Sequence, residues 1–269
     1  MRYFFHIAYR GNNYSGWQRH KNANTVQQII EEAFGKVLKY PVAINGCGRT
    51  DAGVNASQYF FHADIENEWD FDLKFRLNRL LPEDIAIFDI IPMQGLPHAR
   101  FDATQRTYNY FIHTEKDPFL SAVSSFYQLD SLDFDKMKLA VALLPKYNDY
   151  RALCTTPDKN EHTICHVSQA ELYSDSTGKR IRFQVSSNRF LSKMIRIITG
   201  KLLKIGTGKL SIDEFENHLI TLQTPKTLDP AYPQGLYLSK IVYPYLDLKP
   251  NSDFINPVGN INEEFWRKL

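Results

Sequence analysis

The hydrophobic pattern of the first half of the chain predicts both strands and helices. Residues 2–9 alternate in the period of a β-strand, with an aromatic face that includes Tyr3 and Phe5. From Thr25 onward, a capping-box pattern and an apolar stripe up to Leu38 predict a helix. Similar reasoning predicts the elements that follow: strands around 42–45, 57–65 and 85–91, and a helix over about 72–81 that stops at Pro82. This half therefore reads β-α-β-β-α-β.

The second half repeats this order loosely, starting with a strand that places Arg106, Tyr108 and Tyr110 on one face. The other expected elements are helices over about 133–144, 190–200 and 212–222, and strands near 163–173, 180–186 and 235–244. We therefore expect an α+β fold in which two pseudo-symmetric halves share a mixed, mostly antiparallel central sheet, with a cleft between them. The expected boundaries are 1–97, 98–245 and a polar tail, 246–269, in which Phe265 and Trp266 suggest docking on the body or on a partner.

Composition narrows the class of protein. With 269 residues, 43% hydrophobic and 23% charged, the chain is expected to form a folded core of ordinary composition. The sequence starts without the pattern of a signal peptide and holds no run long enough for a membrane helix, so we expect a cytoplasmic protein. Cys47, Cys154 and Cys165 are widely spaced and the eight histidines are scattered, so we expect reduced, mostly buried thiols and no metal.

The distribution of charge says more than the net charge of +2. The first thirty residues contain no acid, and neither does the stretch from 179 to 209, whose basic residues are Lys179, Arg180, Arg182, Arg189, Lys193, Arg196, Lys201, Lys204 and Lys209. Such stretches are typical of surfaces that contact phosphate backbones, although any single lysine can equally belong to a solvated surface of mixed charge. The loop 10–18, which contains Tyr14 and Trp17, is expected to reach for a nucleic acid in a similar way.

The stretch from Gly46 to Val54 concentrates three glycines, Arg49 and Asp51 within nine residues. Glycines permit positive φ and close approach of another group, and a guanidinium can orient a carboxylate. One interpretation is a tight loop in which Asp51 caps a backbone amide and Arg49 is solvated. The other is a catalytic carboxylate on a connection between two strands, supported by rigid elements on both sides.

The motif Gly48-Arg49-Thr50-Asp51-Ala52-Gly53-Val54 resembles that of the tRNA pseudouridine synthase A family, which usually reads Gly-Arg-Thr-Asp-Ala-Gly-Val-His-Ala. In that family this Asp is the catalytic residue, so the resemblance implies that Asp51 carries the chemistry and that the chain has the pseudouridine synthase fold. One departure is Asn55, at the position where the family has His. An amide does not titrate near neutral pH as imidazole does.

Three further stretches between Tyr3 and Pro244 resemble the same family. Residues 9–18 keep most of its Tyr-Asp-Gly-Thr-x-Tyr-x-Gly-Trp-Gln, and 101–110 match Phe-x-Ala-x-x-Arg-x-Tyr-x-Tyr, whose first Tyr lies against the target base. Residues 190–200 are similar to Phe-x-x-x-Met-Val-Arg-Asn-x-x-Gly, whose basic residue pairs with the catalytic Asp, although Ser192 and Lys193 stand where histidines are common. The resemblance thus implies catalytic and substrate-binding sets: catalytic Asp51, Arg49 and Arg196, and substrate-binding Tyr108, Arg106, Thr50 and Lys193.

The resemblance implies an isomerase that converts uridine to pseudouridine in the anticodon stem-loop of tRNA, at positions 38 to 40, as a homodimer without a cofactor. A uridine inside an RNA stem must be flipped out to react, and an aromatic ring such as Tyr108 can stack on it. Two other hypotheses remain at this point. One is an RNA-binding paralogue without activity, and the other is a nucleosidase that uses Asp51 to release free uracil.

Overall fold

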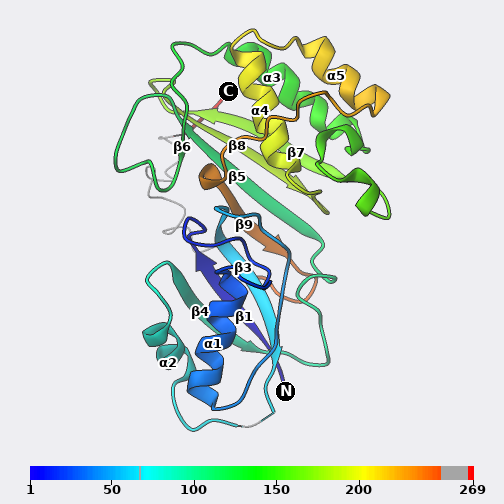
Figure 1. Ribbon diagram of the computed structural model, residues 1–269. Coiled ribbons are helices and arrows are strands. Elements are labelled where there is room, and N and C mark those ends of the chain that lie inside the picture. Colours follow the sequence, from blue (N-terminus) through cyan, green and yellow to red (C-terminus); the bar gives the residue numbers. More distant parts are fainter. Residues whose placement is uncertain (67, 250–265) are drawn as a thin grey trace. The chain divides into compact units, whose positions relative to one another are not determined.

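The computed structural model describes residues 1–66, 68–249 and 266–269 (Figure 1). In these residues the chain divides into two compact units, which we call the N unit (residues 1–104 and 237–249) and the C unit (residues 105–236 and 266–269). Both contain helices and mostly antiparallel strands, with a few parallel pairs. The predicted α+β class with a mixed, mostly antiparallel sheet is therefore confirmed.

In the N unit the strands are ordered β9-β3-β1-β4, and β2 also pairs with β3. Strand β1 is antiparallel to both of its neighbours, whereas β9 runs parallel to β3, with Asn55 opposite Tyr237. The elements are β1 (Arg2–Tyr9), α1 (Val26–Leu38), β2 (Ile44–Gly46), β3 (Asn55–Asp64), α2 (Leu73–Leu80), β4 (Ile85–Pro92) and β9 (Leu236–Val242). Up to β4 they follow the predicted β-α-β-β-α-β order.

The core of the N unit covers both faces of β1. On one face Phe5 stacks on Phe61 of β3, with ring centroids 4.7 Å apart, and meets the edge of Phe34 of α1 at 5.2 Å. On the other face Phe4 packs against Tyr243, which follows β9, at 5.5 Å. Aromatic rings that meet stacked or edge-on add to the stability gained by burying their surface. The strand is therefore buried on both sides, which fixes the framework on which its following loop is built.

The start of α1 has the expected Thr25 cap, which is one half of the predicted capping box. The hydroxyl of Thr25 accepts a hydrogen bond from the backbone amide of Gln28 at 3.4 Å, which satisfies one of the amides left open at a helix start. The side chain of Gln28 donates to Glu32 further along the helix. At α2 the carboxylate of Asp72 takes the capping role and accepts from Phe75 at 2.9 Å. Both helices thus begin at polar residues that the sequence provides for this purpose.

In the C unit the strands are ordered β10-β7-β8-β5, and β6 runs parallel beside β5. Helices α3, α4 and α5 lie together on one side of these strands (Figure 1). The strands and α-helices are β5 (Gln105–His113), β6 (Ser125–Phe126), α3 (Phe134–Leu143), β7 (Val167–Ser174), β8 (Arg180–Ser187), α4 (Met194–Gly206), α5 (Ile212–Thr221) and β10 (Arg267–Lys268). Short 3₁₀ turns connect them: η1 (Leu144–Lys146), η2 (Arg151–Leu153), η3 (Pro157–Lys159) and η4 (Pro233–Gly235).

Helix α4 begins later than the apolar pattern indicated. We predicted a helix from residue 190, but the first helical residue is Met194, and Lys193 before it has a left-handed φ of 57°. The amide of Met194 donates to the carbonyl of Leu191 at 3.1 Å, so this stretch is a turn. The prediction was wrong here because Leu191 buries its side chain from the turn itself and the half-buried Phe190 packs against Tyr108, which imitates a helical stripe.

The end of the chain docks on the C unit. Trp266 is buried, and β10 pairs antiparallel with β7. The guanidinium of Arg182 lies over the rings of Tyr173, at 4.0 Å, and Trp266, at 5.4 Å, in cation–π contacts. The expected docking on the body is confirmed for Trp266, whereas Phe265 and most of the tail lie outside the described residues.

The cysteines and the helices bear on two further expectations. Cys47, Cys154 and Cys165 are all buried free thiols, as predicted. Burial raises the pKa of the Cys165 thiol to about 12, which keeps it protonated at neutral pH. Within the described ranges, no helix has both the length and the hydrophobicity that a membrane crossing requires.

Candidate active site

Asp51 lies in a tight turn between β2 and β3, which we call the Asp51 turn (residues 47–54). The amide of Cys47 donates to Phe60 at 2.8 Å and so extends the pairing of the two strands up to the turn. Inside it, the amide of Val54 donates to the carbonyl of Asp51 at 3.2 Å, and Gly53 has a positive φ of 76°. Asp51 itself is half-buried. The backbone of the carboxylate-bearing residue is thus fixed by the turn and by the strands beside it.

A second loop packs on this turn backbone to backbone. It follows β1, spans residues 10–18, and is called here the aromatic loop. The amide of Trp17 donates to the carbonyl of Thr50, and the amide of Gly53 donates to the carbonyl of Tyr14, both at 3.2 Å. Gly16 has a φ of 92°, and a Cβ added there would lie less than 3.0 Å from the Thr50 carbonyl oxygen. Glycine is required at this position because no side chain fits between the two segments.

The two aromatic side chains of this loop are part of the core and do not reach outward as we expected, whereas Arg10, Asn12, Asn13, Ser15 and Gln18 are exposed. Trp17 is only 2% exposed and Tyr14 only 6% exposed. The indole of Trp17 packs on the ring of Tyr59, with centroids 4.2 Å apart. The ring of Trp17 packs against those of Tyr9, Tyr59 and Phe61, which cover it. The two loop residues that carry aromatic rings support the Asp51 turn through backbone hydrogen bonds to Thr50 and Gly53.

Hydroxyl groups of the sheet hold the turn on both sides of Arg49. The Thr50 hydroxyl is buried and shares a hydrogen bond of 2.9 Å with the hydroxyl of Tyr9 on β1. The hydroxyl of Tyr59 on β3 donates to the carbonyl of Gly48 at 2.6 Å. Arg49 lies between these anchored positions and is exposed. The turn thus presents a solvated guanidinium two residues before the carboxylate, on a backbone that the strands restrain.

Asn55 joins the Asp51 turn to the aromatic loop. Its side chain is fully buried, and its Oδ1 accepts a hydrogen bond from the backbone amide of Gly11 at 2.8 Å. A Cβ on Gly11 would meet the backbone of Val54 at less than 3.0 Å, so the two chains approach closely at this point too. The amide that replaces the family's His therefore has a structural role that needs no titrating proton.

Two of the predicted residues of the C unit lie on β5. Arg106 and Tyr108 are two positions apart and share one face of the strand, opposite Ser187 and Val185 of β8. The Tyr108 ring meets the ring of Phe190 edge-on, with centroids 5.1 Å apart and an angle of 82°. Arg106 donates to the carbonyl of Asn188 at 3.1 Å. The start of β5 and the turn before α4 thus hold these two side chains together.

Lys193 and Arg196 stand at the start of α4. Lys193 is exposed at the N-cap, and Arg196 is half-buried in the first turn. The Nε of Arg196 donates to the carbonyl of Ala231 at 2.7 Å, and the amide of Ala231 returns a bond to the Arg196 carbonyl at 2.8 Å. At Gly200 a Cβ would lie less than 3.0 Å from the carbonyl of Asp229. The segment 229–231 therefore crosses α4 at close range and fixes the stem of Arg196.

The same segment connects α4 to β5. The carbonyl of Tyr232 accepts a hydrogen bond from the Tyr110 hydroxyl at 2.6 Å, and the amide of Tyr232 donates to the hydroxyl of Tyr127 at 2.9 Å. Burial raises the pKa of Tyr110 well above its ordinary value, so the hydroxyl stays a donor. Arg196 and the strand that carries Tyr108 are thus linked through one short stretch of backbone within the C unit.

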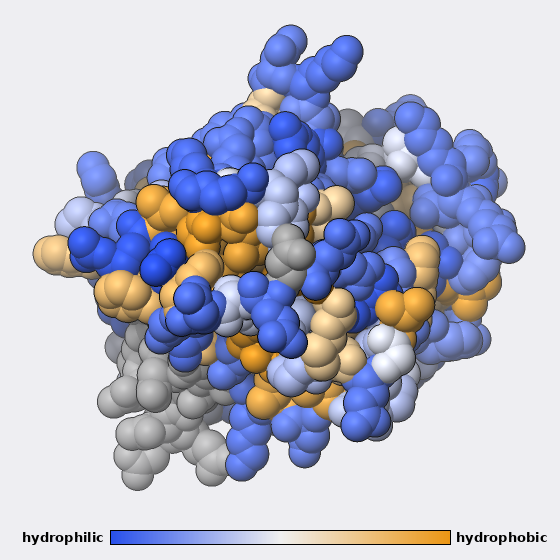
Figure 2. Space-filling model, turned by 90° about the horizontal axis from the view of Figure 1, so that it is seen from below, coloured by the Kyte–Doolittle hydropathy of each residue, from blue (hydrophilic) through white to orange (hydrophobic). Residues whose placement is uncertain are grey.

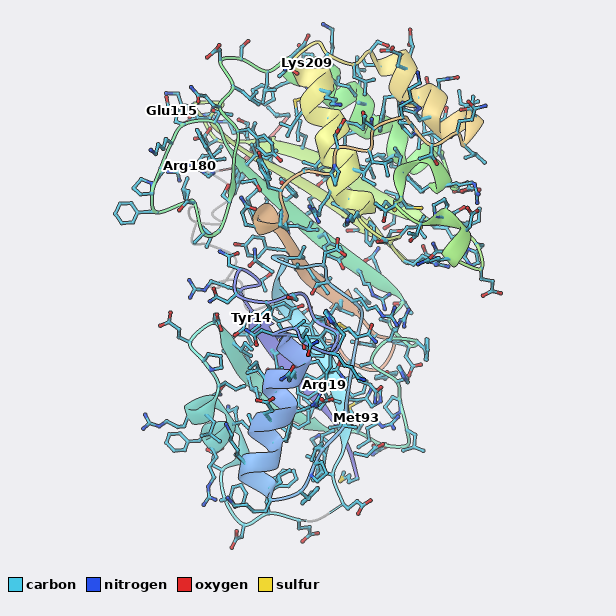
Figure 3. The ribbon with its side chains drawn as sticks, viewed as in Figure 1. Tyr14, Arg19, Met93, Glu115, Arg180 and Lys209 are labelled. Atoms are coloured by element: carbon cyan, nitrogen blue, oxygen red, sulfur yellow. The ribbon has the colours of Figure 1, made fainter. Side chains whose placement is uncertain are left out.

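Several cations of the basic stretch 179–209 make contacts within the C unit, and the phosphate-binding surface along this stretch stays a prediction. Lys201 is 4% exposed and donates to the carbonyl of Thr227 at 3.0 Å, and burial lowers its pKa. Other engaged cations include those of the ion pairs Lys179–Glu115, Arg180–Asp117 and Lys204–Asp229, and Arg182 over its aromatic rings. Exposed cations of the stretch include Lys193 and Lys209, the latter labelled just beyond α4 in Figure 3.

The structure thus groups the predicted residues in two sets. The N unit brings together Arg49, Thr50 and Asp51, and the C unit brings together a second set on β5 and α4, namely Arg106, Tyr108, Lys193 and Arg196. Across residues 1–66, 68–249 and 266–269, no cluster of three or more His, Cys, Asp or Glu side chains could hold a metal ion.

Comparisons with known proteins agree with the motifs. A family described as tRNA pseudouridine synthase matches residues 147–244. A tRNA pseudouridine synthase A of Porphyromonas gingivalis is 39% identical over 247 residues, which cover 90% of this chain and 97% of the relative. That of Parabacteroides distasonis is 40% identical over 90% of this chain and 96% of its own length. The Staphylococcus aureus protein of the same name is 30% identical over 97% of this chain and 95% of its own.

Proposed function

The chain belongs to the tRNA pseudouridine synthase A family, and from that premise we propose that it acts on uridines 38 to 40 of the tRNA anticodon stem-loop with Asp51 as nucleophile. The enzyme is an isomerase. Its reaction breaks the N-glycosidic bond of uridine, turns the base and joins C5 to the same ribose carbon, while the C5 proton is lost and a proton is gained at N1. No oxidant, reductant or added group is needed.

We assign the role of nucleophile to Asp51 because hydrogen bonds hold the backbone of its turn in place. The carboxylate is half-buried, and the backbone on both sides of it is hydrogen-bonded to the aromatic loop, at Thr50 and at Gly53. A carboxylate that acts as a nucleophile or stabilises charge raises the reaction rate most when it is held in place before the substrate binds. Since the buried Thr50 hydroxyl is bonded to Tyr9, we assign Thr50 a part in positioning rather than direct contact with the base.

The residues of the C unit supply the other proposed roles. Tyr108 stacks on the flipped uracil, and its edge contact with Phe190 keeps the ring in one orientation. Arg106 and the exposed Lys193 bind phosphate groups of the RNA. Arg196, whose stem is fixed by Ala231, is proposed as the cation that the family resemblance pairs with the catalytic carboxylate. Arg49, exposed two residues before Asp51, orients the substrate beside it.

The test is tritium release from tRNA labelled at uracil C5, with the wild-type protein and with Asp51→Ala and Asp51→Asn. Asp51→Asn keeps the shape of the side chain, so a loss of release cannot be ascribed to a cavity. We expect release from the wild type and none above background from either variant, with the affinity for tRNA kept within about threefold. Release from Asp51→Asn at the wild-type rate would remove Asp51 from the chemistry.

The same assay separates the alternatives. A nucleosidase would also break the glycosidic bond but would leave free uracil and an abasic site, so the products are chromatographed for uracil. An RNA-binding paralogue would bind tRNA and release no tritium. We expect all released label as water and no free uracil.

We further propose a cytoplasmic homodimer, as the family resemblance implies. Apolar side chains at the surface support association: Phe75 and Leu80 on α2 are 62% and 51% exposed. Figure 2 likewise shows hydrophobic side chains grouped on the face seen from below, with hydrophilic side chains around them. Light scattering after size exclusion tests the assembly; twice the monomer mass of 31.2 kDa is expected, and the monomer mass at micromolar concentration would contradict it.

A further inference from the structure

The aromatic loop is also held at a second place, which lies outside the Asp51 turn. The hydroxyl of Tyr14 donates a short hydrogen bond to Oδ1 of Asp84, in the turn before β4. The side-chain amide of Asn13 donates to the other oxygen, Oδ2, at 2.8 Å, and the backbone amide of Arg10 donates to the Asp84 carbonyl at 2.9 Å. Three residues of the loop are therefore tied to this one residue.

The Tyr14–Asp84 bond is buried at both ends. Tyr14 is 6% exposed and Asp84 is 7% exposed. Hydrogen bonds to an ionised acceptor are about twice as strong as those between neutral groups, and a buried carboxylate that loses a donor suffers a large desolvation cost. Burial first, and then the bond to Asp84, raises the pKa of Tyr14, so its hydroxyl remains a donor at neutral pH.

Tyr14 also touches the Asp51 turn, through its backbone. Its carbonyl accepts the hydrogen bond of the Gly53 amide at 3.2 Å, and Gly53 lies two residues after Asp51. One residue therefore connects the carboxylate of Asp84, through its side chain, to the turn that carries Asp51, through its main chain (Figure 3 labels Tyr14). A displacement of the ring moves the carbonyl that holds Gly53.

We propose that Tyr14 and Asp84 are positioning residues for Asp51: the Asp84 carboxylate fixes the Tyr14 ring, and the Tyr14 carbonyl fixes the turn at Gly53. This proposal rests on the proposed function, because the consequence of misplacement is read from the isomerisation. Neither residue contacts the substrate. Their effect is on the placement of the carboxylate, and misplacement by about 1 Å can cost on the order of 100-fold in rate.

The test uses Tyr14→Phe, which removes the hydroxyl and keeps the ring, and measures kcat, KM and tRNA affinity. We expect kcat for tritium release to fall by about tenfold or more, with KM and the dissociation constant for tRNA within about twofold. The matched control is Tyr147→Phe, because the Tyr147 hydroxyl also donates to a carboxylate, that of Glu216 at 2.7 Å, but in the C unit. We expect that variant to keep the wild-type kcat.

A second readout does not depend on activity. Amide hydrogen exchange at Gly53 and its neighbours should become at least about fivefold faster in Tyr14→Phe and unchanged in Tyr147→Phe, since opening of the turn no longer works against the Asp84 bond. Because Tyr14 and Asp84 act through the same bond, Tyr14→Phe combined with Asp84→Asn should lower kcat less than the product of the two single effects.

The outcomes separate this proposal from the proposed function. No tritium release from the wild type overturns the proposed function, and the exchange rate at Gly53 still decides whether Tyr14 holds the turn. Unchanged exchange and unchanged kcat in folded Tyr14→Phe overturn the positioning role while the function stands. A fall in kcat that tracks only the folded fraction of the variant, measured by urea unfolding, overturns it as well.

Discussion

The two units hold their site residues by different means. Tyr108 stands on a strand and Arg196 on a helix, so their own ladders of hydrogen bonds fix the backbone beneath them. Asp51 stands on an irregular turn whose backbone is also hydrogen-bonded to the aromatic loop, at Thr50 and Gly53. A residue on a regular element depends mainly on its neighbours in the same element, whereas Asp51 depends on a segment about forty residues earlier. Substitutions outside the sequence motif should therefore displace Asp51 more than they displace Tyr108 or Arg196.

The largest effect is expected where the two loops touch. Gly16→Ala would place a methyl group less than 3.0 Å from the Thr50 carbonyl oxygen, at a φ of 92°. Steric overlap and backbone strain each cost roughly 1–3 kcal/mol, so we expect the free energy of unfolding to fall by about 3 kcal/mol or more, measured by urea denaturation. Gly48→Ala is the control within the motif, because nothing lies within 4 Å of a Cβ there. Equal stability of the two variants would show that the close contact at Gly16 does not matter for the stability of the fold.

Acidification should destabilise the N unit through His62. This side chain accepts a hydrogen bond from the Ala99 amide at 3.1 Å. Burial first, and then the charge of Arg2, lowers the pKa of His62 from 6.5 to about 4. The folded protein disfavours the charged imidazole, so this residue's contribution is fully present above pH 6.5 and is lost as the pH falls from 6.5 to 4. The loss amounts to about 3 kcal/mol.

The check is urea unfolding of the wild type and His62→Gln at pH 7 and pH 4. The variant should lose about 3 kcal/mol less than the wild type on acidification. In the C unit burial also lowers the pKa of His113, so His113→Gln should likewise remove part of the acid sensitivity. Parallel pH profiles for the wild type and His62→Gln would contradict the assignment.

A loss of intermediate size is expected at Tyr108, where the strand holds the ring. Tyr108→Ala removes the proposed stacking, which is worth roughly 1–3 kcal/mol per base, and kcat/KM should fall by about fivefold to 150-fold. Tyr108→Phe keeps the ring and should keep the affinity for tRNA. If Tyr108→Phe also keeps kcat, the hydroxyl has no part in the mechanism, and if Tyr108→Ala keeps kcat/KM, the ring does not bind the base.

The smallest effect is expected from single phosphate contacts. Lys193→Ala should reduce the slope of log affinity against log salt by about 0.7–0.9, the amount for one phosphate. Lys201→Met is the matched control, because this lysine is 4% exposed and bonded to Thr227. We expect it to leave the slope unchanged. Filter binding over 50–200 mM salt measures both, and equal changes would place the buried lysine on the RNA path.

The sequence was most informative where structure is regular. Alternation over residues 2–9 and the stripe behind Thr25 predicted β1 and α1 to within a residue or two, because one buried face imposes a period. The same rule misplaced the start of α4, since Leu191 is buried and Phe190 half-buried in a turn. Periodicity reports burial and does not report which backbone conformation achieves it.

The residues of the candidate site were predicted from the sequence motifs. The contacts that hold the Asp51 turn in place were not. Gly11 and Gly16 read as ordinary loop glycines, and only the fold shows that each leaves room for another backbone. Asp84 lies in an unremarkable Pro-Glu-Asp turn, and its bond to Tyr14 spans seventy positions. Such contacts leave no local pattern, because each partner is selected by a segment far away in the sequence. The same holds for the pairing of Lys201 with Thr227, which a count of charges does not reveal.

The central claim, an Asp51-dependent isomerisation in the anticodon stem-loop, is tested most directly by mapping the product. Unmodified tRNA is incubated with the wild type or Asp51→Asn, treated with a carbodiimide that marks pseudouridine, and read by primer extension. We expect stops at one or more of positions 38, 39 and 40 with the wild type and none with the variant. The same stops with Asp51→Asn, or wild-type stops only outside these positions, would contradict this claim.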